Sequence, residues 1–567
     1  MILWMWLACN STTQAPVSQD WRPNVIACPG DPVCAQATDA PLTAGAAVAD
    51  IVPACFETWT DVDGDAAYDA ATDTFADCGC DRLCPSDPAW SAADAGEGDA
   101  TFQATWIAGF GNARAATGVR GAADGLAGAG DGLWARALVL EQGDATVALV
   151  TLDVVGFFYD DVLRLRAAVA AQTPAIDHVL VHATHVHQAP DTMGLWGPSV
   201  GRSGVNAEWM AQIEAATRDA VAAAYAARVP VSVRTGEVHA RDYASNGVAN
   251  LISDTRDPVI IDDRLGALQL IDAADRTVAT LVSFGNHPET RGADNLLLTS
   301  DYVHALRKTV ESGVDWGDGL RPGVGGTALF LNAAVGGMMT SLHAEVHDPA
   351  GRVWSDASWE KADASGQLLG DMALDALAQG TEDDAPTLAF GAQSRYLPVE
   401  NHGLQAMTLM GIIQRATYHW DPEQPITADN RPDIQTEVNV LTIGDTRWLG
   451  IPGELLPEVW IGGYDGSHTP PGTPILSPDN PNPPDLTRAP TDGGWRAQAG
   501  ATKTWILGLA NDEIGYLIPP FSFELDPTAP YLFEAEGDHY EETNSLGPDT
   551  VPLLEPDVMA LLDWRPE

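Results

Sequence analysis

The chain has 567 residues, of which 45% are hydrophobic and 19% charged, so it is long enough for one large domain or roughly two to three ordinary ones and encloses a substantial core. Its 79 acidic and 29 basic residues give a formal net charge of −50, and a field of that sign repels phosphate backbones and anionic lipids. This composition excludes a disordered chain and argues against nucleic acid as a partner, and we interpret the acidic surplus as a solvated surface.

The first residues resemble the end of a bacterial lipoprotein signal. Residues 1–8 are apolar and run into Cys9, which this pattern predicts to be the lipidated residue. The apolar stretch is short and lacks a basic start, and a misassigned start codon is the alternative explanation. We assign residues 1–20 to a lipoprotein signal and linker, which predicts a secreted or cell-envelope protein that reaches the membrane surface through its lipid anchor. No later segment approaches the about 18 uninterrupted apolar residues of a membrane-spanning helix.

All seven cysteines lie in the first 84 residues, which argues against a catalytic thiol in the rest of the chain. The six that follow Cys9 allow three disulfides, in pairings that the sequence leaves open. They are Cys28, Cys34, Cys55, Cys78, Cys80 and Cys84. A zinc knuckle is the alternative, but Cys78-Gly79-Cys80 leaves too short a loop for the usual ligand pair. We therefore predict a disulfide-bearing leader over residues 21–100, in an oxidising compartment.

A candidate calcium loop lies inside this leader. Asp61, Asp63 and Asp65 alternate around Gly64, and such carboxylates beside a turn suit Ca²⁺. A complete EF-hand would carry Glu at position 72, where this chain has Thr72. The alternatives are a calcium site outside the EF-hand pattern and a solvated acidic turn.

From residue 101 onward strand patterns alternate with helical ones. Residues 133–141 and 146–153 flank the turn Gln142-Gly143-Asp144 and predict a hairpin. Residues 161–172 and 207–228 predict helices, with a strand over 178–183 between them. Residues 464–494 are rich in Pro, Gly and Asp and predict a surface insertion. The pattern indicates an α/β domain with a mixed sheet over residues 101–567.

Four strand-like runs each end in a polar side chain that could bind a metal or transfer a proton. His185 and His187 follow the run 178–183, and two histidines at this spacing share one side of an extended segment. His287, Glu454 and Tyr516 follow three further runs. Functional groups collect beyond the carboxyl ends of strands, which predicts that these groups converge on one metal.

The same residues carry a family resemblance. Five short motifs, in chain order through residues 105–555, resemble motifs of the neutral (non-lysosomal) ceramidases. They are Leu133-Trp-Ala-Arg-Ala, His185-Val-His187 with Pro190, Leu298-Thr-Ser-Asp301-Tyr, Pro452-Gly-Glu454, and residues 508–516 with the later Tyr540-Glu541-Glu542.

The resemblance implies a zinc-dependent amidohydrolase with one Zn²⁺ per chain, bound by His185, His287, Glu454 and Tyr516. His187 would activate water or stabilise the developing oxyanion, and Arg241 would lie near the substrate amide. The chemistry would be attack of water on an amide carbonyl, because zinc lowers the pKa of bound water to about 7 and polarises the carbonyl.

The implied substrate is a small lipid, first of all the N-acyl bond of ceramide. Two departures from the family pattern bear on this choice: Gln188 replaces a small hydroxyl residue, and residues 332–340 lack the acidic and seryl members of a family loop. The family's C-terminal immunoglobulin-like domain is also not recognised. The alternatives are a zinc hydrolase of another amide or ester, and a non-catalytic surface lipoprotein of the same fold. The oligomeric state stays open.

A rival motif predicts a different enzyme class. Residues 197–201 fit G-x-S-x-G, the serine-hydrolase elbow, which requires a strand before it and a helix directly after it. Pro198 precedes the serine and Arg202-Ser203-Gly204 follows it, so a turn is the better interpretation.

Overall fold

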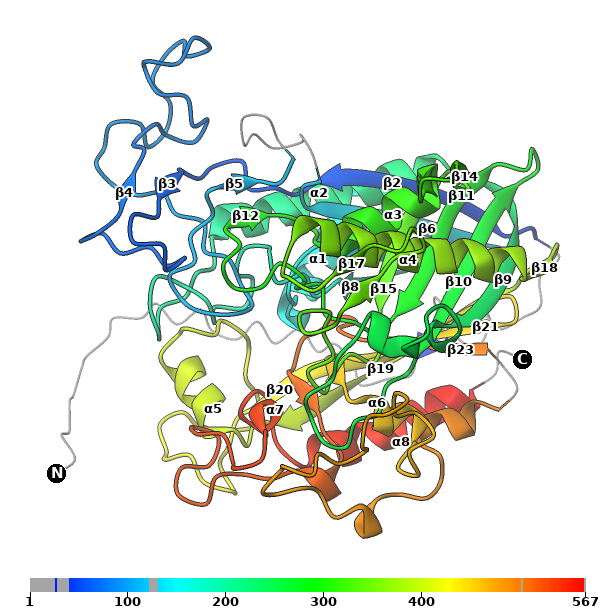
Figure 1. The fold of residues 1–567 in the computed structure, drawn as a ribbon. Coiled ribbons are helices and arrows are strands. Elements are labelled where there is room, and N and C mark those ends of the chain that lie inside the picture. The colour runs from blue at the N-terminus through cyan, green and yellow to red at the C-terminus, as the bar shows by residue number, and fades with distance from the viewer. Residues whose placement is uncertain (1–25, 28–39, 122–130, 501–502, 565–567) are drawn as a thin grey trace.

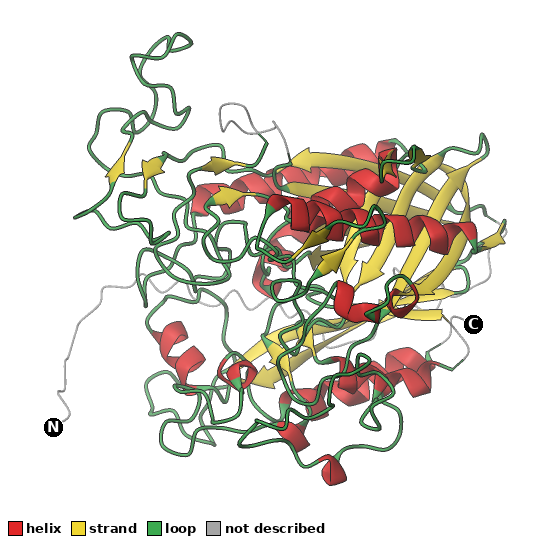
Figure 2. Ribbon diagram, viewed as in Figure 1, coloured by secondary structure: helices red, strands yellow, loops and turns green. Residues whose placement is uncertain are grey.

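The computed structural model describes residues 26–27, 40–121, 131–500 and 503–564, and it consists of two β-sheets packed face to face with helices on their outer sides (Figure 1). Figure 2 shows the helices gathered above one sheet and below the other. This layering confirms the predicted α/β architecture with a large mixed sheet.

The larger sheet has nine strands and mixes parallel with antiparallel pairs. Along its main path the strands are β15 (Thr327–Asn332), β11 (Thr277–Phe284), β10 (Arg264–Asp272), β9 (Val229–His239), β2 (Thr43–Asp50), β6 (Trp134–Gln142), β7 (Ala145–Leu152) and β8 (His178–Ala183), with β18 (Thr381–Asp383) beside β9. The β11–β15 and β7–β8 pairs are parallel. The other neighbours in this sheet are antiparallel, including the predicted hairpin of β6 and β7.

The smaller sheet has five strands. In order they are β1 (Ile26–Ala27), β19 (Leu388–Pro398), β20 (Asp433–Ile443), β21 (Thr446–Gly450) and β23 (Lys503–Leu507). Five two-stranded pairs lie outside the two sheets: β3 (Trp59–Thr60) with β4 (Thr74–Phe75), β5 (Gly118–Val119) with β12 (Leu297–Leu298), β13 (Gly313–Asp315) with β14 (Leu320–Pro322), β16 (Val346–His347) with β17 (Val353–Trp354), and β22 (Glu454–Leu455) with β24 (Tyr516–Leu517).

The described residues form longer helices that pack on the sheets and short helices in the segments between strands. They are α1 (Tyr159–Gln172), α2 (Ala207–Ala226), α3 (Tyr302–Ser312), α4 (Trp359–Ala378), α5 (His402–Leu409), α6 (Pro457–Ile461), α7 (Tyr540–Thr543) and α8 (Thr550–Asp563), with 3₁₀ turns at Ala240–Asp242, Gly247–Asn250, Leu486–Arg488, Trp495–Ala499 and Pro520–Ser522. Helices α2, α3 and α4 pack on the nine-stranded sheet, and α8 packs under the five-stranded sheet. The two helices predicted from periodicity correspond to α1 and α2.

The N-terminal end of α2 illustrates how local sequence sets these boundaries. The side chain of Asn206 accepts hydrogen bonds from the backbone N–H groups of Glu208 and Trp209, which satisfies donors that the helix itself leaves free. Trp209 and Ile213 then bury the apolar side of the helix against the sheet. Helix α2 thus packs on the sheet through the apolar side of an amphipathic sequence.

A continuous apolar layer fills the space between the two sheets. Leu138 and Leu149 of the larger sheet belong to the same buried cluster as Phe390, Leu441 and Trp448 of the smaller one. Burying a side chain of this size contributes about 1.5–3 kcal/mol. The layer therefore holds the two sheets in one relative position, and this also determines where the loops at the strand ends lie.

The predicted leader is partly integrated into this fold. Strand β2, which lies in the segment 21–100, pairs with β6 and β9, so the boundary predicted at residue 101 does not coincide with an edge of the sheet. A Cβ atom on Gly45 would lie 2.2 Å from the carbonyl oxygen of Ala224, so β2 needs small residues where α2 crosses it. This small-residue composition is the reason that the segment did not stand out as a strand.

Four of the leader cysteines form two disulfides, Cys55–Cys80 and Cys78–Cys84. This pairing confirms disulfides in the leader and contradicts a zinc knuckle for these four residues. Cys9, Cys28 and Cys34 lie outside the described residues, as do residues 1–20, so lipidation and a third disulfide stay predictions.

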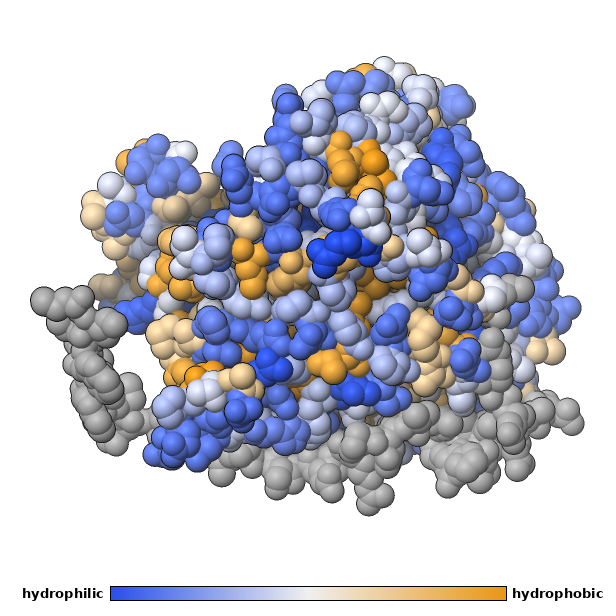
Figure 3. Space-filling model, turned by 90° about the horizontal axis from the view of Figure 1, so that it is seen from below, coloured by the Kyte–Doolittle hydropathy of each residue, from blue (hydrophilic) through white to orange (hydrophobic). Residues whose placement is uncertain are grey.

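The surface agrees with the acidic composition. The face drawn in Figure 3 is mostly hydrophilic, with small and separate hydrophobic patches. Within the described parts of the chain, every helix is too short or too polar to cross a bilayer. Asp61, Asp63 and Asp65 hold carboxylate oxygens within 4.8 Å of one another on an exposed turn, and calcium binding there stays a prediction.

Candidate metal centre

Three histidines from two loops meet at one end of the nine-stranded sheet. His185 and His187 follow β8, His287 follows β11, and one ring nitrogen of each lies within 4.8 Å of the others. The H-x-H segment is not extended, contrary to the prediction, because β8 ends at Ala183 and His185 has φ 67°. This left-handed turn, rather than strand alternation, brings the two rings to the same side.

The Nδ1 atom of each ring contacts an oxygen atom outside the cluster. His185 Nδ1 lies 2.6 Å from the carbonyl oxygen of Val155, and His287 Nδ1 lies 2.8 Å from that of Met339. Because a carbonyl oxygen only accepts, both Nδ1 atoms carry a proton and both Nε2 atoms face the cluster. Nε2 is therefore the atom through which each of the two rings would bind a metal.

His187 differs from the other two histidines in its partner. Its Nδ1 lies 3.0 Å from a carboxylate oxygen of Glu289, and its Nε2 lies 3.3 Å from Nε2 of His185. A carboxylate at Nδ1 makes the imidazole a stronger base and stabilises its protonated form. Gly109 lies against this ring, since a Cβ atom there would lie 2.7 Å from His187 Cγ.

Glu454 closes the group from the opposite sheet. It begins β22 just after β21, and its Oε2 lies 3.0 Å from His287 Nε2 and 3.4 Å from His185 Nε2. Strand β22 pairs in parallel with β24, in a register that places Tyr516 beside Glu454. The Tyr516 hydroxyl lies 4.0 Å from the sulfur of Met338.

Burial and the close carboxylates set the charges of these groups. Burial alone would lower the pKa of His287, but the hydrogen bond that its ring donates to Glu454 outweighs burial and raises that pKa to about 9. Burial lowers the pKa of His187 to about 4, so this imidazole is neutral at neutral pH. Burial also opposes ionisation of Glu454, yet His185 and His287 hold its pKa well below the usual range. Burial raises the pKa of Tyr516 well above 10, so its phenol is protonated.

The cluster opens into a cavity with mostly apolar walls. His185, His187, Glu454 and Tyr516 belong to its polar lining. The apolar lining is made of Val155, Phe158, Met193, Leu195, Trp196, Val399, Leu404, Ile413, Ile434, Ile514 and Leu546. An apolar pocket with a few polar groups at one end is the usual form of a small-molecule site.

The other candidate residues lie elsewhere or act differently. Arg241 pairs with Asp263, its Nη2 lying 2.6 Å from Oδ1, and it does not line the cavity, so the structure does not bring it to the histidines. The buried His182 of β8 contacts the Asn332 carbonyl oxygen at 3.2 Å and does not line the cavity. No helix directly follows residues 197–201, since α2 begins at Ala207, and this excludes the serine-hydrolase elbow.

The sequence patterns did not predict Glu289 and Glu513 as site residues. Both are buried acids at the site. Glu289 was signalled only by its position two residues after His287. Glu513 lies in the segment 508–516 singled out for Tyr516, and it is itself one of the residues that line the cavity.

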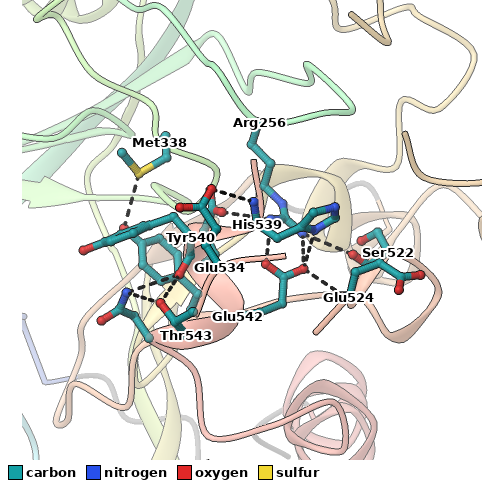
Figure 4. Close-up of polar contacts among 12 residues, drawn as sticks. Arg256, Met338, Ser522, Glu524, Glu534, His539, Tyr540, Glu542 and Thr543 are labelled. Atoms are coloured by element: carbon teal, nitrogen blue, oxygen red, sulfur yellow. Dashed lines mark hydrogen bonds and ion pairs between the residues drawn. The ribbon is translucent and has the colours of Figure 1, made fainter. Parts of the chain in front are cut away.

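Behind Tyr516 and Tyr540 lies a buried charge cluster. Arg256 donates to Glu541 Oε2 at 2.8 Å and to Glu542 Oε1 at 2.9 Å, and His539 Nδ1 lies 3.0 Å from that same Glu542 oxygen (Figure 4). All of these acid and base groups are buried. One guanidinium therefore holds together the short segment that carries Tyr540 to the cavity wall.

The buried Glu458 of α6 faces the same cluster and predicts a pH effect on stability. Burial raises the pKa of Glu458 from 4.5 to about 7. An acid whose pKa is raised by folding binds its proton more tightly in the folded state, so stability falls as pH rises from about 4.5 to about 7. Glu458→Gln removes this loss and should raise the free energy of unfolding at pH 8, relative to pH 4.5, by up to about 3 kcal/mol.

Urea unfolding of both proteins at the two pH values measures this difference. Glu382→Gln, at an exposed glutamate, is the control and should behave as the unmodified protein at both. An equal effect of Glu458→Gln at pH 4.5 and pH 8 would contradict the assignment.

Comparison with known proteins identifies the fold. No family model and no curated protein matches this sequence. Among solved structures, neutral ceramidase from Pseudomonas aeruginosa matches with a TM-score of 0.55 and 14% identity, over 93% of this chain and 74% of that chain. A ceramidase complexed with C2 matches with a TM-score of 0.53 and 14% identity, over 93% of this chain and 75% of that chain. The predicted resemblance to neutral ceramidases is confirmed at the level of the fold.

Proposed function

We propose that the protein is a zinc-dependent hydrolase of a linear amide bond. The observation that carries this proposal is the convergence of three imidazoles and one carboxylate, two of those imidazoles and the carboxylate lining a mostly apolar cavity. A cavity of this kind accepts an apolar chain and places a polar bond at the metal-binding groups.

The donor set fits zinc in type and spacing. Zinc ligands at roughly 2.0–2.1 Å in a tetrahedron lie about 3.3 Å from one another. The pairs His287–Glu454 and His185–Glu454 are separated by 3.0 and 3.4 Å. Nitrogen and oxygen donors in this number are typical of a catalytic zinc site. We assign one zinc per chain to His185, His287 and Glu454, with Tyr516 as the fourth side chain.

The residues around this centre have different roles in hydrolysis. When bound, zinc supplies an acidic water and polarises the substrate carbonyl. The backbone contacts of His185 and His287 orient the two rings before substrate arrives. Neutral His187 accepts the proton of the attacking water at Nε2, and Glu289 stabilises the imidazolium at Nδ1. His187 then returns that proton to the leaving amine.

The fold and the cavity favour an N-acyl lipid as substrate, with ceramide the first choice. Two of the similar folds are ceramidases, one of them complexed with C2. The apolar lining suits a fatty acyl chain or a sphingoid chain. The same centre would also hydrolyse another amide or an ester of similar shape, because its chemistry acts on the carbonyl group.

The paired cysteines support a site of action outside the reducing cytosol. A lipid anchor at Cys9 would place the cavity at a membrane surface, where N-acyl lipids reside. Because the protein is strongly acidic, we expect a zwitterionic or neutral surface rather than an anionic one.

Metal analysis and an activity assay test the proposal together. We expect about one zinc per chain as purified, and release of fatty acid from N-dodecanoylsphingosine that stops with a zinc chelator and returns with added zinc. Glu382→Gln, at an exposed glutamate outside the cavity lining, serves as the matched control. A folded protein that contains no zinc, or hydrolysis that a chelator does not affect, would overturn the proposal.

A further inference from the structure

Glu513 is a buried acid in the wall of the apolar cavity. Its side chain is 3% exposed, and it lines the same cavity as His187 and Tyr516. Its Oε2 atom is buried and has no hydrogen-bond partner among the described residues. A buried polar atom without a partner is destabilising, so a hydrogen-bond partner from the substrate would recover free energy on binding.

The surrounding residues hold this carboxyl in one position. Gly515 donates its backbone N–H to Glu513 Oε1 at 2.8 Å. A Cβ atom on Gly156 would lie 2.7 Å from Glu513 Cγ and 2.7 Å from the sulfur of Met193. The Glu513 side chain therefore packs directly against the backbone of Gly156. Gly156 directly follows Val155, whose carbonyl oxygen anchors His185. The free oxygen is thus positioned by the same loop that orients a predicted metal ligand.

The neighbours of Glu513 limit what can bind there. Glu454 and Asp512 oppose a second carboxylate, because both are acidic groups that act on this carboxyl. Arg415 acts on it in the opposite sense, but its guanidinium is already paired with Asp512 at 2.8 Å. A neutral hydroxyl avoids the repulsion that a second carboxylate would meet. It can either donate or accept a hydrogen bond, so it pairs with a carboxyl group in either state.

We infer that Glu513 is a specificity-determining residue that binds a hydroxyl group lying within a few bonds of the scissile amide. Substrates of this class are hydroxylated N-acyl amides, and the analogue without the hydroxyl leaves Oε2 buried and unpaired. The inference rests on the proposed function for the identity of the scissile bond. It concerns binding as well as turnover, so it is tested separately from catalysis.

The probes are two amides of matched size, N-dodecanoyl-2-aminoethanol and N-dodecanoylpropylamine. A third, the propylamide of 2-hydroxydodecanoic acid, carries the hydroxyl on the acyl side. We expect the zinc-loaded protein to bind and hydrolyse one of the hydroxylated amides at least about tenfold better than the plain one, the discrimination of one hydrogen bond. Glu513→Leu should bring this ratio to about 1 with unchanged zinc content.

Two further variants separate recognition from folding. Glu513→Gln keeps a donor and an acceptor at the same position and should keep most of the preference. Glu458→Gln changes another buried acid with an unpaired oxygen, outside the cavity lining, and should keep all of it. If the unmodified protein shows no preference in Kd or kcat/KM for either hydroxylated amide, or if Glu513→Leu keeps it, the inference is wrong. A preference in Kd without any hydrolysis would instead contradict the proposed function.

Discussion

His185→Ala should reduce the zinc content from about one per chain to a background level and abolish hydrolysis. The substitution removes an Nε2 donor that lies 3.4 Å from Glu454 and 3.3 Å from His187, near the middle of the donor set. Metal analysis after dialysis measures the first effect, and fatty-acid release measures the second. Circular dichroism should be unchanged, because the deleted ring contacts only Val155 and the cluster itself through hydrogen bonds.

His187→Ala should have a different result. We expect it to keep zinc and to lose roughly 10²–10⁴-fold in kcat, the usual contribution of a general acid–base group. The reason is that His187 contacts Glu289 on its outer side and is assigned to proton transfer rather than to metal binding. His402→Ala, at a histidine outside the cavity lining, is the matched control. Equal loss of zinc in His185→Ala and His187→Ala would show instead that His187 is a ligand.

Arg256→Met should lower the free energy of unfolding by about 3–5 kcal/mol at pH 8, because breaking a buried ion pair leaves its partners uncompensated. The Arg256 side chain is 2% exposed and its two acidic partners, Glu541 and Glu542, are 0% exposed. Methionine fills part of the same volume without a charge. The carboxyl groups of Glu541 and Glu542 would then stay buried without the guanidinium that pairs with both.

The pH dependence of this loss provides a second criterion. Burial raises the pKa of Glu541 to about 7, and protonation of that group relieves the uncompensated charge. The destabilisation by Arg256→Met should therefore be smaller at pH 5 than at pH 8. Denaturant unfolding at both pH values measures it. Arg276→Met is the control: its guanidinium pairs with Asp272 but its side chain is 77% exposed, so the loss should stay below about 1 kcal/mol. Similar losses in both variants would contradict the analysis.

Patterns within single segments predicted the local structure well. Apolar periodicity identified α1, α2, β8 and the β6–β7 hairpin, because helix and strand periods are properties of neighbouring residues. Clustered cysteines identified the disulfide-bearing leader. Strand β2 was not predicted, because its small residues are required by the close packing of helix α2, which is distant in the sequence.

For the site, the sequence alone determined which side chains have the chemistry of a metal centre and that each follows a strand. It did not determine that they meet, because β8 and β11 belong to one sheet and β21 and β23 to the other. The apolar layer between the sheets decides that meeting, since it fixes their relative position through contacts between residues far apart in the chain. In the same packing Arg241 pairs with Asp263 outside the cavity lining. Glu289 contacts His187, and Glu513 lines the cavity. Only the tertiary structure could decide these, because a carboxyl group acquires its role from burial and from its partners.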